Sequence, residues 1–100
     1  MNELWYVLTQ HWDEDRDYDS EVAFFLSEEG AISYAIESTF KFGAYYENDY
    51  DYDVEVSYGI QRYKFIDVDV KYKDGNERAA WERYQIGKVV PKESGEQKEN

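Results

Sequence analysis

The sequence predicts an α+β fold: an antiparallel sheet of about four or five strands with one amphipathic helix packed on one face, in the order ββαβββ. Apolar residues recur at helical spacing in residues 28–42, whereas period-two alternation marks residues 49–60. A chain of 100 residues can bury one core but not two. We therefore expect a single domain over residues 1–91 and a polar, disordered tail over residues 92–100.

Two strands are expected before the helix. Residues 4–12 are rich in aromatic and aliphatic side chains, which suit a pleated, half-buried surface. Residues 22–26 form a short, continuous apolar run, which is typical of a buried strand. We expect these two strands to form a hairpin whose loop spans residues 13–20.

The helix is expected over residues 28–42. Ser27 is a favourable N-cap, and Glu28 and Glu29 suit the positive end of the helix dipole. Lys41 near the end and Gly43 just beyond it are the expected stop signals. The apolar residues that recur along the face predicted to pack on the sheet are Ala31, Ile32, Ala35, Ile36 and Phe40.

Three strands are expected after the helix. From Asp49 to Ile60, acidic or small residues alternate with apolar ones, so this strand has one apolar face. The phase of the alternation changes beyond it, which indicates a bulge or break near Phe65. Asp74-Gly75 is a hairpin-turn signal, and it leads to a last strand over residues 78–90.

The composition argues against several classes of protein. The chain has no cysteine, hence no disulfide and no thiolate metal site, and a reducing cytoplasm is the expected compartment. No segment approaches the roughly 20 apolar residues that span a bilayer. The net charge of -12 also disfavours contact with anionic lipid, DNA or RNA. We expect no membrane and no direct nucleic-acid binding, and partners that are basic.

The negative charge is confined to one region of the chain. Residues 13–55 contain fourteen acids and two bases, whereas nine acids and nine bases cancel elsewhere. Within that region the acids recur at every second residue in two rows. The first row consists of Asp13, Asp15, Asp17, Asp19 and Glu21, and the second, which follows Glu47, of Asp49, Asp51, Asp53 and Glu55.

An extended strand would place the carboxylates of a row on one side at intervals of roughly 6.6 Å, twice the rise per residue. This spacing and sign resemble a line of nucleic-acid phosphates. Like charges held in rows repel one another and destabilise the fold, which favours a functional interpretation. Three other interpretations stay open: solvated loop and strand acids, the acidic surface of a halophile, and a calcium site. Neither row has the glycine and glutamate spacing of an EF-hand.

The sequence contains no recognisable catalytic motif. His11 is the single histidine and lies in a predicted strand, where a structural or a surface role is far more common than catalysis. There is no glycine-rich phosphate loop and no nucleophile-elbow serine. We expect no enzymatic activity, no cofactor and no metal. Tyr18, Tyr45 and Tyr46, which lie in predicted loops beside acids, are candidate anchors for a protein partner.

Small size, strong acidity, many aromatic residues and the lack of a catalytic motif together resemble the phage-encoded inhibitors that imitate nucleic acid, such as anti-restriction, anti-CRISPR and uracil-glycosylase inhibitor proteins. The resemblance is one of composition, in residues 13–19 and 45–53. These families share no common motif, so the resemblance assigns no functional residue. It implies a cytoplasmic inhibitor that blocks a basic nucleic-acid-binding protein of a host defence system.

Two functional hypotheses follow from the sequence. In the first, the two acidic rows and the three tyrosines bind the basic groove of a nucleic-acid-binding protein. In the second, the chain is a small, non-catalytic interaction or dimerisation domain that uses its aromatic surface or a sheet edge, and its acids serve only solubility. The sequence leaves the oligomeric state open.

Overall fold

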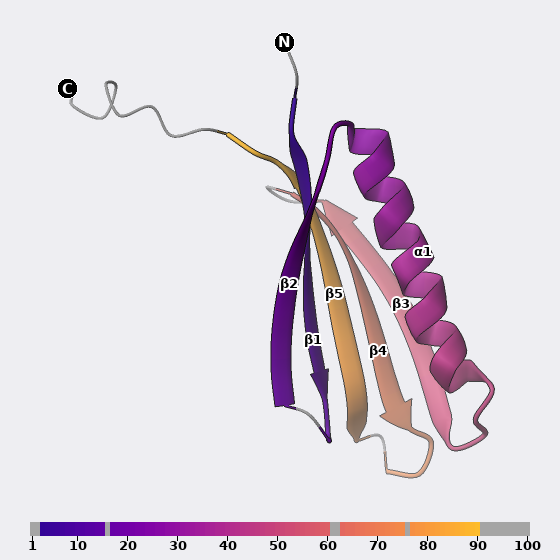
Figure 1. Cartoon of the computed structure of the whole chain (residues 1–100). Coiled ribbons are helices and arrows are strands. Elements are labelled where there is room, and N and C mark those ends of the chain that lie inside the picture. Colours follow the sequence, from indigo (N-terminus) through magenta and orange to yellow (C-terminus); the bar gives the residue numbers. More distant parts are fainter. Residues whose placement is uncertain (1–2, 16, 61–62, 76, 91–100) are drawn as a thin grey trace.

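A computed structural model describes residues 3–15, 17–60, 63–75 and 77–90. Within these residues, five strands form one antiparallel sheet in the order β2-β1-β5-β4-β3, and the helix α1 packs on one face of it (Figure 1). The predicted α+β class and the order ββαβββ are confirmed. The predicted tail, residues 92–100, lies outside the described residues.

Strands β1 (Trp5–Asp13) and β2 (Asp17–Phe25) form the first hairpin. The loop predicted over residues 13–20 is wrong, because the ladder continues to the pair Asp13–Asp17. Aspartate has a low strand propensity. An antiparallel sheet can leave the carboxylates of a strand in water, however, so the backbone hydrogen bonds to β1 outweigh that propensity here. Three acids of the first row, Asp17, Asp19 and Glu21, therefore belong to a strand and not to a loop.

The rest of the sheet consists of β3 (Tyr52–Ile60), β4 (Lys64–Tyr72) and β5 (Arg78–Lys88). The phase change predicted near Phe65 is the reversal of the chain between Ile60 and Lys64, and the β3–β4 ladder passes Phe65 without a bulge. The predicted turn between β4 and β5 is confirmed. Gly75 adopts a φ of 96° there, a conformation that favours glycine.

Helix α1 (Glu28–Glu47) begins where predicted, with Ser27 Oγ accepting a hydrogen bond from the Gly30 N–H at 3.0 Å. It does not end at Gly43, which is buried inside the helix. A Cβ atom at Gly43 would lie 3.7 Å from Val54 Cγ1, so this glycine packs on the sheet instead of capping the helix. In the described part of the chain, no helix has the apolar length that crossing a membrane requires.

The core lies between α1 and the sheet. The buried helix residues are small, which brings the helix close to the strands: Ala31, Ala35, Thr39 and Gly43. Ile36 and Phe40 were predicted to face the sheet, but both are exposed along the side of the helix. The buried sheet residues are Val7, Val68, Val70, Ala79, Ala80, Tyr84 and Ile86. No described element covers the opposite side of the sheet, which we call the open face (Figure 1).

Candidate functional site

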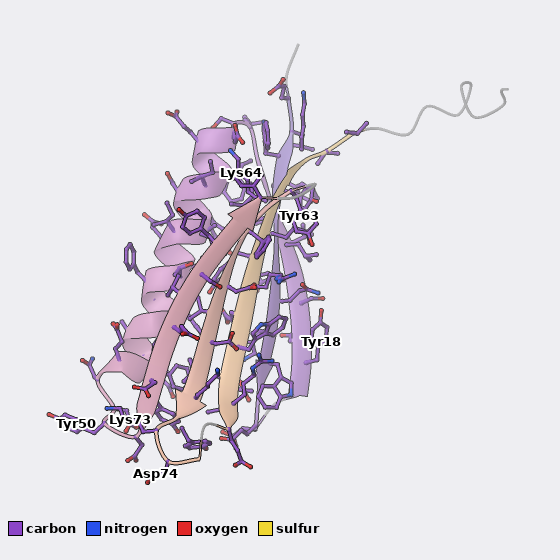
Figure 2. The ribbon with its side chains drawn as sticks, turned by 180° about the vertical axis from the view of Figure 1, so that it is seen from behind. Tyr18, Tyr50, Tyr63, Lys64, Lys73 and Asp74 are labelled. Carbon is purple, nitrogen blue, oxygen red and sulfur yellow. The ribbon has the colours of Figure 1, made fainter. Side chains whose placement is uncertain are left out.

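Residues of both acidic rows meet at one end of the molecule. The β1–β2 turn, the α1–β3 loop and the β4–β5 turn lie together at the lower end of Figure 1. There, Asp13, Glu14 and Asp15, together with Asp49 from a distant segment, line a hollow of about 300 Å³. We call these four acids and the neighbouring Asp51 the acidic end. Figure 2 shows Tyr50, Lys73 and Asp74 at this end of the sheet, and Tyr63 and Lys64 at the other.

Packed tyrosines connect the acidic end to the fold. Ring centroids are 4.9 Å apart in the pair Tyr45–Tyr46, and 5.2 Å apart in both Tyr46–Tyr52 and Tyr52–Tyr72. The Tyr72 hydroxyl donates a hydrogen bond to Glu14 Oε2, which ties β4 to the β1–β2 turn. Tyr45 and Tyr46 were predicted to lie in a loop, but they belong to the last turns of α1. Tyr45 is exposed and Tyr46 is half-buried.

Two acids of the rows stabilise turns. Asp13 Oδ1 accepts a hydrogen bond from the Asp15 N–H at 2.9 Å, and Asp49 Oδ1 accepts one from the Asp51 N–H at 3.0 Å. Both contacts join a side chain to the backbone two residues on, as Asx turns do. At Asp13–Asp15 and Asp49–Asp51, the spacing of two residues between acids therefore has a local structural cause, whether or not the acids also bind a partner.

The first row continues along the helix-covered face of the sheet, at the β2 edge. Glu21 lies two residues from Ala23, which pairs with the buried Val7, and Asp19 lies two residues further along. Alternate residues of a strand share a face, so both acids lie on the side of α1. Glu21 accordingly lines a shallow hollow together with Lys41 of the helix.

The second row continues along the open face, at the β3 edge. Asp53 and Glu55 alternate with Tyr52 and Val54, which pack against the core beneath α1. The strand parts of the two rows therefore lie on opposite faces and at opposite edges of the sheet. A flat partner surface would be unable to contact both rows along their length, because the rows meet only through the turns of the acidic end.

Acids of β4 on the open face are neutralised by arginines of β5. Arg83 forms a bidentate pair with Asp67, with N···O distances of 2.6 and 2.7 Å. Arg78 Nε lies 2.8 Å from Asp69 Oδ1. Among the described residues, no ion pair of this kind involves the acids of β3. On the open face, the acids of β3 are therefore less compensated than those of β4, although Lys71 lies opposite Asp53 in the ladder.

A polar network that the sequence did not predict centres on His11, beneath α1. Its Nε2 lies 2.6 Å from Asp13 Oδ2 and its Nδ1 lies 2.6 Å from Glu82 Oε2. Glu82 also accepts a hydrogen bond from the Tyr84 hydroxyl. Partial burial acts to lower the pKa of His11, but the hydrogen bonds to the two carboxylates outweigh it and raise that pKa above its usual value. The contacts support a structural ion pair that joins β1 to β5.

The remaining predicted residues lie away from the hollow. Tyr18 was predicted in a loop but lies in β2, at the edge of the open face (Figure 2), and its hydroxyl accepts a hydrogen bond from Gln10 Nε2 at 2.6 Å. Glu47 ends α1 and lines a separate apolar groove beside β3. Within the residues that the structure describes, no group of three or more histidine, aspartate or glutamate side chains is arranged to hold a metal ion.

No protein-family model, no curated protein and no solved structure matches this chain. Its function is therefore inferred from its own geometry and charge.

Proposed function

We propose that the chain is an acidic binding protein that blocks the basic nucleic-acid groove of a protein partner, with the acidic end as its contact surface. The observation that carries this proposal is the convergence of Asp13, Glu14, Asp15 and Asp49 from two distant segments onto one hollow. The acids of β3 extend this surface along one edge of the open face. A cytoplasmic location is compatible with a chain that has no cysteine.

The acidic end suits this role because its carboxylates are held in place before binding. Turn contacts of Asp13 and Asp49, together with the packed tyrosines, reduce the ordering that binding requires. Complementary charge raises the association rate, and salt screens it over about 8 Å at physiological ionic strength. The partner's cleft should enclose the end of the sheet, because only there do both rows contribute.

Replacing four acids by their amides, as Asp49→Asn, Asp51→Asn, Asp53→Asn and Glu55→Gln, is expected to abolish partner binding and to preserve the fold. The asparagine introduced at position 49 would keep an oxygen that accepts the residue-51 N–H. The chain is immobilised, proteins are captured from a host lysate at about 50 mM salt, and binding of each captured protein is measured again at about 200 mM. Duplex DNA should compete with the chain for the partner.

A matched pair of variants separates position from net charge. Asp51→Asn with Asp53→Asn removes one charge of the acidic end and one from the adjoining start of β3, whereas Glu29→Gln with Glu37→Gln removes two exposed charges from α1. The first should weaken binding much more than the second. A partner that binds DNA and this chain simultaneously would refute the proposal. Affinity that is unchanged between the two salt concentrations would favour the alternative, an interaction domain whose acids serve only solubility.

A further inference from the structure

An apolar groove of about 540 Å³ runs between α1 and β3. Its walls include Ile32, Ile36 and Phe40 from the helix, and Val56, Tyr58 and Ile60 from the strand. Phe40 is 71% exposed and Tyr58 is 82% exposed. Contiguous apolar surface of this kind on a small domain marks a site of interaction, because a monomer gains nothing from leaving it in water.

The groove borders an open edge of the sheet. β3 pairs with β4 alone, and it is nine residues long, without proline and without a register shift against β4. Proteins usually block such an edge with a bulge, a proline or a charge on the buried side. The other edge strand, β2, has Asp19 and Glu21 on its helix-covered side. β3 has Val56, Tyr58 and Ile60 there instead, so the apolar flank of β3 opens onto the groove. The exposed apolar residues of β2, among them Val22 and Phe24, lie on the open face, away from the groove.

We propose that β3 and the groove form a self-association surface. Two copies of the chain pair their β3 strands antiparallel, around a two-fold axis between Val56 and Tyr58, and each groove receives apolar side chains of the other copy. The two five-stranded sheets thereby become one continuous sheet. The surface is distinct from the acidic end and does not depend on the proposed function.

The residue pattern of β3 is self-complementary only in the antiparallel direction. With the axis at Ser57, Glu55 lies opposite Gly59 of the second copy on the open face. On the helix-covered side, Val56 lies opposite Tyr58, an aromatic and β-branched pair of the kind that stabilises sheets. A parallel arrangement in register would instead place Glu55 beside Glu55, where like charges destabilise pairing.

The charges at the two ends of β3 favour the same arrangement. The strand begins beside the acidic end and is followed by Lys64 at the other end of the sheet (Figure 2). Antiparallel pairing keeps the acidic starts of the two strands at opposite ends of the interface, whereas parallel pairing would bring them together. The electrostatic cost of joining two chains of net charge -12 is therefore smallest in this orientation.

A second copy fits the groove better than a small ligand does. Two of the few polar side chains of the groove are already engaged: Lys64 Nζ lies 2.7 Å from Glu28 Oε2, and the Thr39 hydroxyl donates to the Ala35 carbonyl oxygen at 2.8 Å. A ligand site needs polar groups that orient its occupant. The exposed apolar residues of the groove, among them Phe40, Tyr58 and Ile60, together with the open edge of β3 form a surface that a second copy can cover.

Cysteine cross-linking tests the register, because the chain has no cysteine of its own. Residues facing each other across an antiparallel pair have Cα atoms roughly 4.5–5.5 Å apart, within the range that a disulfide spans. Ser57→Cys should form a covalent dimer under mild oxidation. Ser20→Cys, at an exposed position on the other edge strand, is the matched control and should remain monomeric. Equal cross-linking of both variants, or of neither, would overturn the proposal.

Sedimentation measures the same association without a cross-link. The chain should sediment at twice its mass of 12.0 kDa, and Tyr58→Lys should raise the dimer dissociation constant by at least about tenfold. Phe24→Lys, at an exposed position of β2, should leave the dissociation constant unchanged. Added salt should strengthen the dimer, because it screens the repulsion between two negative chains. It should weaken binding of a basic partner, because it screens the attraction between opposite charges. The opposite responses allow each proposal to be tested without the other. A chain that sediments as a monomer up to millimolar concentration at high salt would contradict self-association.

Discussion

At the scale of single residues, His11 shows how one side chain links distant parts of the sequence. It joins Asp13, two positions away, to Glu82 of β5, and an edge-to-face contact places its ring 5.7 Å from that of Phe42 in the helix. The sequence predicted that His11 lies in a strand, with a structural or a surface role. It gave no sign of Glu82, because pairing between β1 and β5 is set by the topology of the whole sheet.

His11→Gln is expected to destabilise the fold in a pH-dependent way. The folded-state pKa of His11 is raised, so its protonated form stabilises the fold fully below its unfolded-state value of about 6.5, and this contribution is lost as the pH rises through the folded-state value. Loss of its charged hydrogen bonds should cost about 1–2 kcal/mol at pH 6. Urea unfolding of both proteins from pH 6 to pH 9 tests this. A difference that stays constant over the range would contradict it.

At the scale of secondary-structure elements, the sequence predicted the type and order of every element, because hydrophobic periodicity is a local property. It failed where tertiary contacts decide the boundaries. Asp17 to Glu21 carry turn-forming residues, yet backbone pairing with β1 makes them strand. Gly43 reads as a stop signal, yet it lies buried inside α1 against Val54, and the helix extends to Glu47.

Gly43→Ala tests how closely α1 approaches β3. A Cβ atom at this position makes an ordinary contact with Val54, so the change should stabilise the fold by about 0.5–1 kcal/mol through the higher helix propensity of alanine. Gly59→Ala is the opposite case, because its Cβ would lie 2.6 Å from the Phe65 ring, and it should destabilise the fold. Urea unfolding at low protein concentration measures both. Destabilisation by Gly43→Ala would mean that the helix needs a closer approach than the structure shows.

At the scale of the whole molecule, the sequence showed which segments carry the acids, but not on which face or at which edge of the sheet each row lies. Period two predicts which residues of one strand share a face, and this held within β3. It carries no information on whether two strands lie at the same edge of a sheet or face the same side. The hollow at the acidic end depends on Tyr46 and Tyr52, whose ring contact requires the folded chain.

Concentrating a net charge of -12 on part of a small domain should make its stability depend on salt. Screening of carboxylate repulsion is expected to raise the melting temperature by several degrees between about 10 mM and 500 mM sodium chloride, where roughly 4–8 °C corresponds to 1 kcal/mol. Calorimetry at a fixed, low protein concentration measures this. The quadruple amide variant at residues 49, 51, 53 and 55 should show a smaller rise. An equal rise in both proteins would show that those acids are not the source of the repulsion.

The described chain enters and leaves the fold at neighbouring points. Trp5 pairs with Lys88, and the Val89 N–H donates to the Leu4 carbonyl oxygen at 2.8 Å, at the end of the sheet away from the acidic end (Figure 1). A resin, fluorophore or carrier domain attached through either point would leave the acidic end facing outward. Two copies fused head to tail through a short linker would form a bivalent chain, in which effective concentration adds to the affinity of each copy.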